Sequence, residues 1–213
     1  MGTAHYFNGS NAYVYIPDSP SLRVNDFTII IWNYRITANP SHYEYIIQKN
    51  SDVWYGSISI TDETGGTTAF RIEAPQGTEN GFYVSNFWDI GKWTMGAFVR
   101  SGSNAYIYKN GTLVASTSGW NTSSIYYTTS SWGIPLYLGG IQRYISNVYI
   151  YNRALSSTEI QQIYNTPNNP PTNGLVLWFG NPDFTNDCCK AIWRDKSGNG
   201  NNGQLYNVQM AYY

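Results

Sequence analysis

The chain is poor in charge and has no long apolar run. Only 12% of its 213 residues are charged, and the formal net charge at pH 7 is -1. A nucleic-acid-binding protein needs a basic stripe or patch, so this composition argues against a nucleic-acid partner. No run approaches the roughly 18 apolar residues of a membrane span, so we expect no membrane span. Residues 1–10 lack the basic and apolar regions of a signal peptide, and none is visible.

Cysteine is also scarce, because the chain has only the adjacent pair Cys188 and Cys189. A disulfide between neighbouring residues is strained, and two cysteines do not make a zinc site. We expect two free or buried thiols. An intermolecular bridge and a vicinal disulfide that stiffens the loop are the alternatives.

Aromatic and small polar residues take the place of the missing charge. The sequence contains 20 Tyr and 8 Trp, with many Ser, Thr, Asn and Gly residues. Aromatic and β-branched side chains favour half-buried strands, whereas Asn and Gly favour tight turns. The composition therefore predicts an all-β protein, and a chain of this length can bury a full core within one domain.

Short alternating runs recur about every ten residues and predict strands. The clearest pair flanks Asn110-Gly111, whose sequence is the signature of a type I′ hairpin. Residues 27–34, FTIIIWNY, are apolar on both faces, which predicts a strand buried between layers with Trp32 as a core residue. With almost no helix, this pattern predicts a two-sheet antiparallel sandwich.

One short helix is expected after Ser156. Ser156 and Glu159 have the spacing of a capping box, and Leu155 and Ile160 that of a hydrophobic staple. The side of the helix expected to pack on a core carries Leu155, Ile160, Ile163 and Tyr164.

Three segments resemble the laminin G-like (concanavalin A-like) jelly-roll modules of the lectin/glucanase superfamily. Residues 148–160, VYIYNRALSSTEI, resemble the closing segment of such a module. Residues 7–22, FNGSNAYVYIPDSPSL, resemble its first conserved block, and residues 105–116, AYIYKNGTLVAS, resemble its hairpin. The resemblance implies a jelly-roll sandwich in a family that serves mostly for binding and scaffolding.

The order of the segments departs from the family pattern. Residues 174–179, GLVLWF, and residues 193–210 resemble the segment that normally begins a module, yet here they end the chain. We therefore predict a sandwich over residues 1–164, a Pro/Asn linker over 165–173, and a strand segment over 174–213. That segment completes its own sandwich, which we favour, or the sandwich of a neighbouring subunit in a homo-oligomer.

The sequence offers no pattern for catalysis. Retaining glycoside hydrolysis needs two carboxylates about 5–5.5 Å apart, but no predicted strand carries an Asp/Glu pair at positions i and i+2. Glu44 is isolated, and Asp62-Glu63 is expected in a turn. His5 and His42 are far apart and accompany no nucleophile motif. We expect the protein not to be an enzyme.

Calcium is the ion that the family resemblance implies. Asp195 and Asn199, in the oxygen-rich and glycine-rich run DKSGNGN, are the candidate ligands. A simple hydrogen-bonded turn is the alternative. The turn at residues 8–11 offers amide oxygens but lacks the carboxylate that family members often have there. Three sequons, at Asn8, Asn110 and Asn121, are candidates for glycosylation.

A shallow sugar site needs exposed aromatic faces together with amide and hydroxyl groups. The loop at residues 117–133 supplies both kinds of group, and aromatic packing onto the sandwich or a neighbouring subunit is the alternative. The residues expected to bind carbohydrate or a partner are Trp120, Asn121, Tyr126, Tyr127 and Trp132, with Trp54, Tyr55 and Trp88 as secondary candidates.

These observations favour a non-enzymatic recognition module that acts outside the cell or at a cell or virion surface. Its expected partner is a glycan or a cell-surface protein. The alternative is a self-assembling structural subunit of a surface, fibre or virion, which would use strand exchange and aromatic loops for its subunit contacts.

Overall fold

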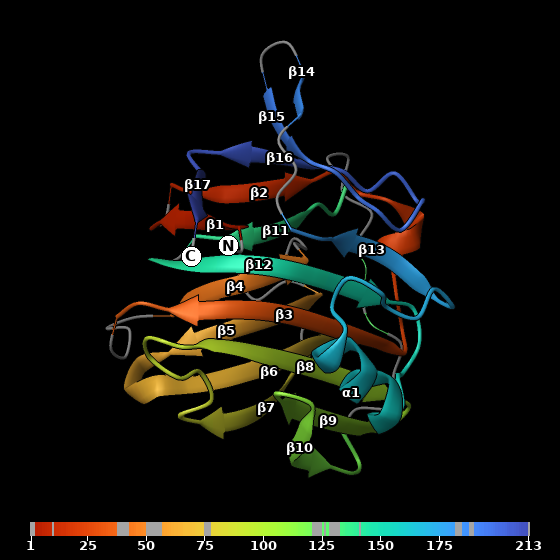
Figure 1. Ribbon diagram of the computed structural model, residues 1–213. Coiled ribbons are helices and arrows are strands. Elements are labelled where there is room, and N and C mark those ends of the chain that lie inside the picture. Colours follow the sequence, from red (N-terminus) through yellow and green to blue (C-terminus); the bar gives the residue numbers. More distant parts are fainter. Residues whose placement is uncertain are drawn as a thin grey trace.

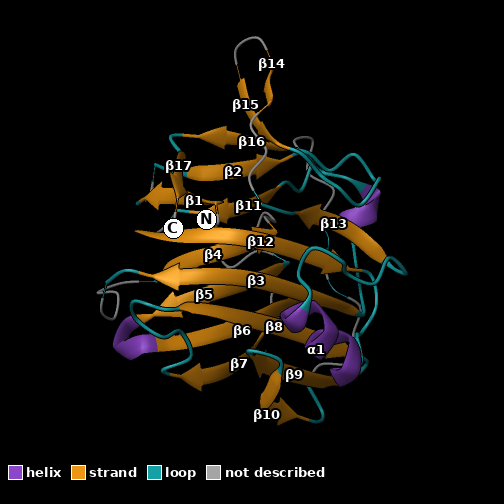
Figure 2. Ribbon diagram, in the orientation of Figure 1, coloured by secondary structure: helices purple, strands orange, loops and turns teal. Residues whose placement is uncertain are grey.

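The protein folds as two antiparallel sheets packed face to face. The computed structural model describes residues 3–9, 11–37, 43–49, 57–74, 78–120, 125, 127, 133–140, 142–181, 185–187 and 190–212. Figures 1 and 2 show the two layers, with the helix α1 (Ser157–Asn165) lying against one of them. The predicted all-β sandwich with one short helix is confirmed.

Sheet A has eight strands among the described residues. In order across the sheet they are β10 (Thr112–Thr117), β9 (Asn104–Lys109), β8 (Trp93–Ser101), β3 (Phe27–Arg35), β12 (Gln142–Tyr151), β1 (Thr3–Asn8) and β17 (Gln209–Tyr212), and β13 (Leu175–Phe179) also pairs with β12.

In the part of the chain that the structure describes, sheet B has nine strands. Their order is β14 (Thr185–Asp187), β15 (Lys190–Trp193), β16 (Gly203–Tyr206), β2 (Tyr13–Ile16), β11 (Leu136–Gly139), β4 (Glu44–Lys49), β5 (Ile58–Glu63), β6 (Thr67–Ala74) and β7 (Thr78–Ser85). The strand β7 was not expected from the sequence.

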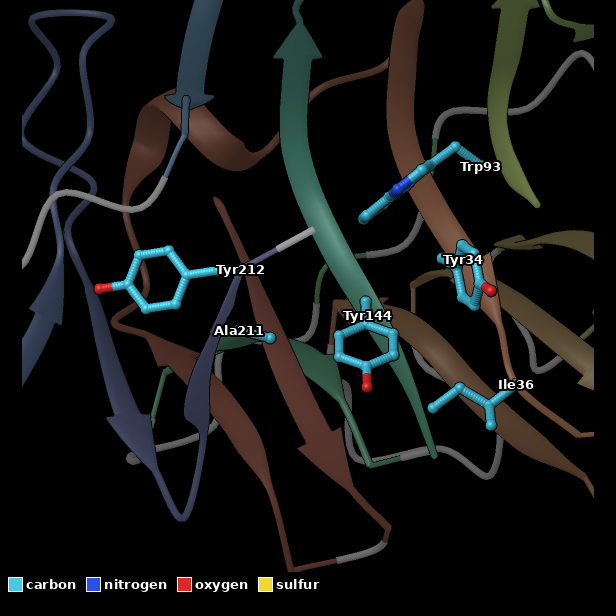
Figure 3. A pocket seen from close by; sticks show the side chains of 6 residues that line it. All are labelled: Tyr34, Ile36, Trp93, Tyr144, Ala211 and Tyr212. Atoms are coloured by element: carbon cyan, nitrogen blue, oxygen red, sulfur yellow. The ribbon is translucent and has the colours of Figure 1, made fainter. Parts of the chain in front are cut away.

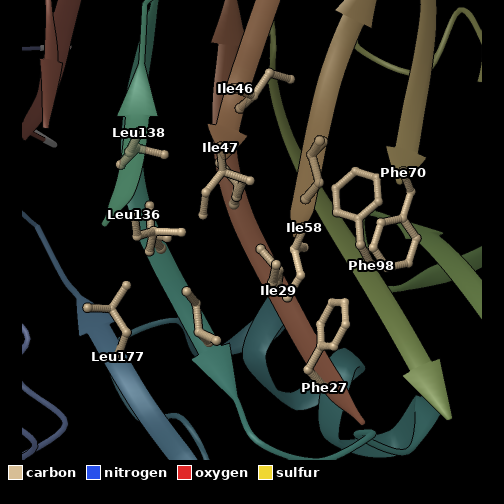
Figure 4. Packing of buried hydrophobic residues seen from close by; sticks show 14 of the residues in the cluster. Phe27, Ile29, Ile46, Ile47, Ile58, Phe70, Phe98, Leu136, Leu138 and Leu177 are labelled. Carbon is tan, nitrogen blue, oxygen red and sulfur yellow. The ribbon is translucent and has the colours of Figure 1, made fainter. Parts of the chain in front are cut away.

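The core lies between the two sheets, because alternate residues of most strands point inward. Figure 4 shows Phe27 and Ile29 of β3 near Ile47 of β4, Phe70 of β6 and other side chains of this cluster. The residues labelled in Figure 4 are buried, with exposed fractions of 4% or less. Burial of this contiguous apolar surface is the main term that stabilises the sandwich.

A second cluster lies on the outer face of sheet A, beneath the helix. Ile160 and Ile163 of α1 pack there with Tyr149 of β12. The capping box is confirmed, because the Ser156 hydroxyl accepts from the Glu159 amide and the Glu159 carboxylate accepts from the Ser156 amide. The position expected for Tyr164 was wrong: its side chain is 39% exposed.

One further local expectation was met and one was not. Asn110 and Gly111 have φ values of 51° and 81°, so the hairpin between β9 and β10 has the positive φ angles of a type I′ turn. Trp32, in contrast, is not in the central core. It is half-buried on the outer face of sheet A, because the helix covers only part of that face.

The C-terminal residues contribute strands to both sheets of the chain. β1 pairs with residues 142–145 of β12, and β13 pairs with residues 148–151 on the same edge. β17 pairs with β1 and β16 pairs with β2. These pairings do not fix where one unit ends and the next begins, so the division of the chain into residues 1–164, 165–173 and 174–213 stays a prediction.

Candidate functional site

The structure describes only part of the loop at residues 117–133, which was expected to bind sugar. Trp120, the tryptophan of this loop that it does describe, is buried. Trp120 is 7% exposed and its ring centroid lies 4.8 Å from that of Phe70 in the core. Trp120 therefore presents no open ring face, and this part of the expectation was wrong. Trp120 follows the alternative in which aromatics pack onto the sandwich.

Tyr127 also packs against the core, and its hydroxyl donates to the Val24 carbonyl oxygen at 2.6 Å. Burial raises the pKa of Tyr127, so the hydroxyl stays protonated. The other loop candidates, Asn121, Tyr126 and Trp132, lie outside the described residues.

Trp88 is the one secondary candidate that lies within the described residues, and it presents no exposed ring face. Trp88 is 3% exposed and packs edge-on against Phe87 at 4.7 Å between centroids. Trp54 and Tyr55 lie outside the described residues.

The loop proposed for calcium is held by hydrogen bonds. Both oxygens of the Asp195 carboxylate are acceptors: Oδ1 from the Trp178 and Ser197 amides, and Oδ2 from the Ser197 hydroxyl and the Asn201 amide, at 2.8–2.9 Å. Asn199 Nδ2 donates to the Leu175 carbonyl oxygen at 3.1 Å. These contacts are those of the hydrogen-bonded turn that is the alternative to a calcium site.

No group of three or more His, Cys, Asp or Glu side chains suited to hold a metal occurs among the described residues. Calcium binding by Asp195 and Asn199 stays a prediction.

Of the sequon asparagines that the structure describes, Asn8 ends a strand and Asn110 lies in a hairpin turn. Asn8 is exposed at the end of β1, and Asn110 accepts a hydrogen bond from the Met95 amide through its side-chain oxygen at 2.8 Å. Glycosylation of Asn8, Asn110 and Asn121 stays a prediction.

Several carboxylates lie in strands and pair with arginines. Asp62 and Glu63 belong to β5, which corrects the turn expected for them. Asp62 is fully buried and contacts Arg143 at 3.1 Å, whereas Glu63 forms an ion pair with Arg71. The absence of enzymatic activity stays a prediction.

His5 lies in β1 with its ring 4.2 Å from that of Trp193. Burial lowers the pKa of His5 to about 3, so the imidazole is neutral at pH 7. His42 lies outside the described residues.

A row of four aromatic side chains crosses the outer face of sheet A. We call Tyr6, Tyr144, Tyr34 and Trp93 the aromatic row. They come from the adjacent strands β1, β12, β3 and β8, and each is directly opposite the next in the strand register. Directly opposed residues of antiparallel strands point to the same face, so the register alone gathers these rings.

The rings of the aromatic row contact one another in sequence. The centroids of Tyr6 and Tyr144 are 5.0 Å apart, and those of Tyr144 and Tyr34, and of Tyr34 and Trp93, are each 5.7 Å apart. These separations lie in the range in which aromatic pairs attract each other. All four side chains are half-buried. Each ring therefore packs against at least one neighbouring ring and still has surface exposed to solvent.

The aromatic row borders a hollow of about 330 Å³. Figure 3 shows the Tyr144 ring between Tyr212 on one side and Tyr34 and Trp93 on the other. The lining residues are Tyr34, Ile36, Trp93, Tyr144, Ala211 and Tyr212. Tyr212, which is 70% exposed, comes from the C-terminal strand β17, so residues from both ends of the sequence build this site.

The hollow is apolar with a few polar groups and no charge among its six lining residues. Tyrosine hydroxyls supply polar groups, and elsewhere in the aromatic row Gln142 Nε2 donates to the Tyr6 hydroxyl at 3.3 Å. Such a surface can stack on a flat apolar ligand face and form hydrogen bonds at its edges.

Sequence reasoning missed this site because each strand buries alternate residues. Ile145 and Ile31 lie in the central core, whereas Tyr144 and Tyr34 point outward from the same strands. The alternation of side chains along a strand shows that the strand has two faces, but it does not show which face points into the core. The one usable signal was a tyrosine at the outward position of several strands.

Solved structures with the same architecture include three that differ in role. A Bacteroides ovatus protein to which carbohydrate binding has been provisionally assigned matches with a TM-score of 0.71 and 14% identity, covering 99% of this chain and 60% of that one. The native heptameric SAP-like pentraxin from Limulus polyphemus has a TM-score of 0.65 and 11% identity, with 99% and 94% covered.

The ligand-binding domain of botulinum neurotoxin serotype D, solved in complex with N-acetylneuraminic acid, has a TM-score of 0.61 and 11% identity, with 77% and 42% covered. At these identities the likeness concerns the fold. The chain spans 60% of the Bacteroides protein and less than half of the toxin chain.

No curated protein matches the sequence. No helix among the described residues is long and apolar enough to cross a membrane. A laminin G family model, described as the concanavalin A-like lectin/glucanases superfamily, matches residues 8–161, which is more than half of the chain. The chain therefore belongs to the concanavalin A-like lectin/glucanase superfamily.

Proposed function

We propose that this protein is a carbohydrate-binding module that holds a neutral glycan on the aromatic row. The observation that carries the proposal is the register of Tyr6, Tyr144, Tyr34 and Trp93, which aligns four rings. Three of them, Tyr144, Tyr34 and Trp93, line a hollow of about 330 Å³. Sugar rings have apolar faces and hydroxyl-bearing edges. The aromatic row offers stacking surface to the faces, and the tyrosine hydroxyls offer donors and acceptors to the edges.

The absence of charge among the six lining residues favours a neutral sugar. An acidic sugar carries a carboxylate that needs a cationic partner to offset its desolvation. The fold neighbours, which include the Bacteroides protein and a toxin domain in complex with a sugar, support carbohydrate as the ligand class. The chemistry of the lining residues supports the choice of a neutral one.

The proposal includes a location outside the cell or at a cell or virion surface, where glycans are displayed. The low charge and the three sequons support this location. Surface labelling of intact cells or particles that carry the protein tests it, because an intracellular pool protected from the label would contradict it.

A glycan array that carries neutral and sialylated probes tests the binding proposal. We expect binding to a subset of neutral glycans, with Trp93→Ala and Tyr144→Ala each weakening it by about tenfold or more, which corresponds to roughly 1.4 kcal/mol or more. Tyr164→Ala is the matched control, because Tyr164 is 39% exposed on α1 and does not line the hollow. Unchanged binding by both site variants, or binding confined to sialylated probes, would overturn the proposal.

A further inference from the structure

Sheet B carries a second group of aromatic side chains. We call Tyr13, Tyr15, Tyr137 and Tyr206 the tyrosine cluster. Tyr13 and Tyr15 belong to β2, which lies between β11 with Tyr137 and β16 with Tyr206. In the strand register Tyr15 is opposite Tyr137 and Tyr13 is opposite Tyr206. Three neighbouring strands thus bring the four rings together on one face.

The rings of the tyrosine cluster contact one another. Tyr13 and Tyr206 are stacked, with centroids 4.8 Å apart and an interplanar angle of 18°. Tyr137 meets Tyr13 and Tyr15 edge-on at 5.9 and 5.6 Å between centroids. Tyr206 is 39% exposed and the other three are half-buried. The cluster therefore has mutual support and also solvent-facing surface.

The tyrosine cluster lies on the opposite side of the sandwich from the aromatic row. Val14 lies in the central core, between Tyr13 and Tyr15 in sequence, so those tyrosines point away from the core. Leu136 and Leu138 place Tyr137 on the outer face in the same way. Because the core separates the two sheets, one ligand unit cannot contact both aromatic surfaces at once.

Two glutamine side chains stand beside the tyrosine cluster. Gln204 is directly opposite Tyr15, and Gln48 is directly opposite Tyr137. The Tyr206 hydroxyl donates to Gln204 Oε1 at 3.1 Å. Burial, with smaller contributions from the other three tyrosines, raises the pKa of Tyr137, so its hydroxyl stays a donor at neutral pH. Stacking surface, hydroxyls and uncharged amides together suit the hydroxyl-rich edge of a neutral sugar better than an ionic partner.

We propose that the tyrosine cluster is a second carbohydrate-binding surface and that the module is therefore bivalent. Bivalence rests on the proposed function, because it needs the aromatic row as the other site. Two sites on opposite faces engage two different glycan chains. The consequence is cross-linking of polysaccharides, and a single site cannot produce it.

The experiment uses the full chain with three neutral polysaccharides: galactomannan, xyloglucan and laminarin. Retention in native gels that contain each polysaccharide measures binding, and the turbidity of protein–polysaccharide mixtures measures cross-linking. The variants are Trp93→Ala/Tyr144→Ala on sheet A, Tyr13→Ala/Tyr206→Ala on sheet B, and all four substitutions combined. Circular dichroism melts confirm folding, and Tyr206→Ala alone replaces the sheet B pair if that pair unfolds.

Each doubly substituted variant, which loses one of the two sites, should still be retained by the polysaccharide that the unmodified protein binds, with an affinity about tenfold lower. Its mixtures with that polysaccharide should no longer become turbid. The combined variant loses both. Wild-type turbidity and retention in the sheet B variant would overturn the second site and leave the proposed function intact. Complete loss of retention in the sheet A variant would likewise leave a single site and overturn bivalence. No retention of the unmodified protein by any of the three polysaccharides would overturn bivalence for these ligands, whereas the glycan array tests the proposed function separately.

Discussion

Arg143 of sheet A and Asp62 of sheet B form an ion pair inside the sandwich, with Nη2 and Oδ2 3.1 Å apart. Both side chains are 1% exposed or less, and Arg35 contacts the same carboxylate oxygen at 3.2 Å. Glu44, which is partly exposed, reaches Arg143 at 3.4 Å. One carboxylate thus links two strands of one sheet to the other sheet.

Replacement of Asp62 by alanine should destabilise the protein strongly. The variant would leave Arg35 and Arg143 buried without their shared counterion, which typically costs about 3–5 kcal/mol. Urea denaturation measures the loss. Asp89→Ala is the control, because the Asp89–Lys109 pair is partly exposed and such a pair contributes about 0–1 kcal/mol. Equal effects of the two substitutions would show that the buried pair is not a special link between the sheets.

The acid stability of the protein should depend on Asp18. Burial opposes ionisation of this carboxyl, but hydrogen bonds from Arg23 and Lys49 outweigh it and lower the pKa of Asp18 from 3.8 to about 2. A lowered pKa contributes stability that is fully present above pH 4 and is lost as the pH falls towards 2. The contribution is on the order of 2 kcal/mol.

Urea unfolding of the native protein and of Asp18→Asn at pH 6, 4, 3 and 2 checks this window. The variant should be less stable at pH 6, and the difference should shrink to nearly zero by pH 2. A difference that is the same at all four pH values would rule out ionisation of Asp18 as its source.

Trp120→Ala should act on stability and not on glycan binding. Trp120 packs on Phe70 in the core, and truncation of a buried tryptophan leaves a cavity that costs about 3–5 kcal/mol. Chemical denaturation gives the stability, and glycan affinity is measured at a temperature where the variant is folded. A folded, equally stable variant that has lost glycan binding would return the site to the loop at residues 117–133.

The protein should be monomeric in solution. β1 and β13 together cover one edge of β12, so the strand that the C-terminal segment completes is already paired. Light scattering should give the mass of one chain, 24.1 kDa, at all concentrations tested. A larger mass that rises with concentration would favour strand exchange between subunits, and with it the structural role considered as the alternative.

The features that could be predicted from the sequence are those that depend on residues close together in the chain. Asn110-Gly111 predicted its turn because positive φ at both positions restricts the residue types, and Ser156 with Glu159 predicted the helix start because the capping box has a fixed spacing. The family resemblance then supplied the two-sheet architecture. These features depend on residues that are close in sequence or on a motif of known order.

The aromatic row could not be found in this way, because it depends on long-range register. Tyr6 and Tyr144 are far apart in sequence and become neighbours only when β1 pairs with β12. Trp120 was expected to be exposed and is buried. The sequence could not decide this, because a tryptophan in a polar loop is equally compatible with exposure and with burial. Asp62 was assigned to a turn because the glycines that follow it are the actual turn.

The most direct test of the account is a map of the glycan site by nuclear magnetic resonance. A neutral oligosaccharide selected on the glycan array is titrated into isotope-labelled protein, and shifts of the aromatic side-chain and backbone signals are followed. Saturable shifts are expected at Tyr6, Tyr34, Trp93 and Tyr144, with the Trp93 indole among the most affected. Shifts confined to the loop at residues 117–133, with the aromatic row unchanged, would contradict it.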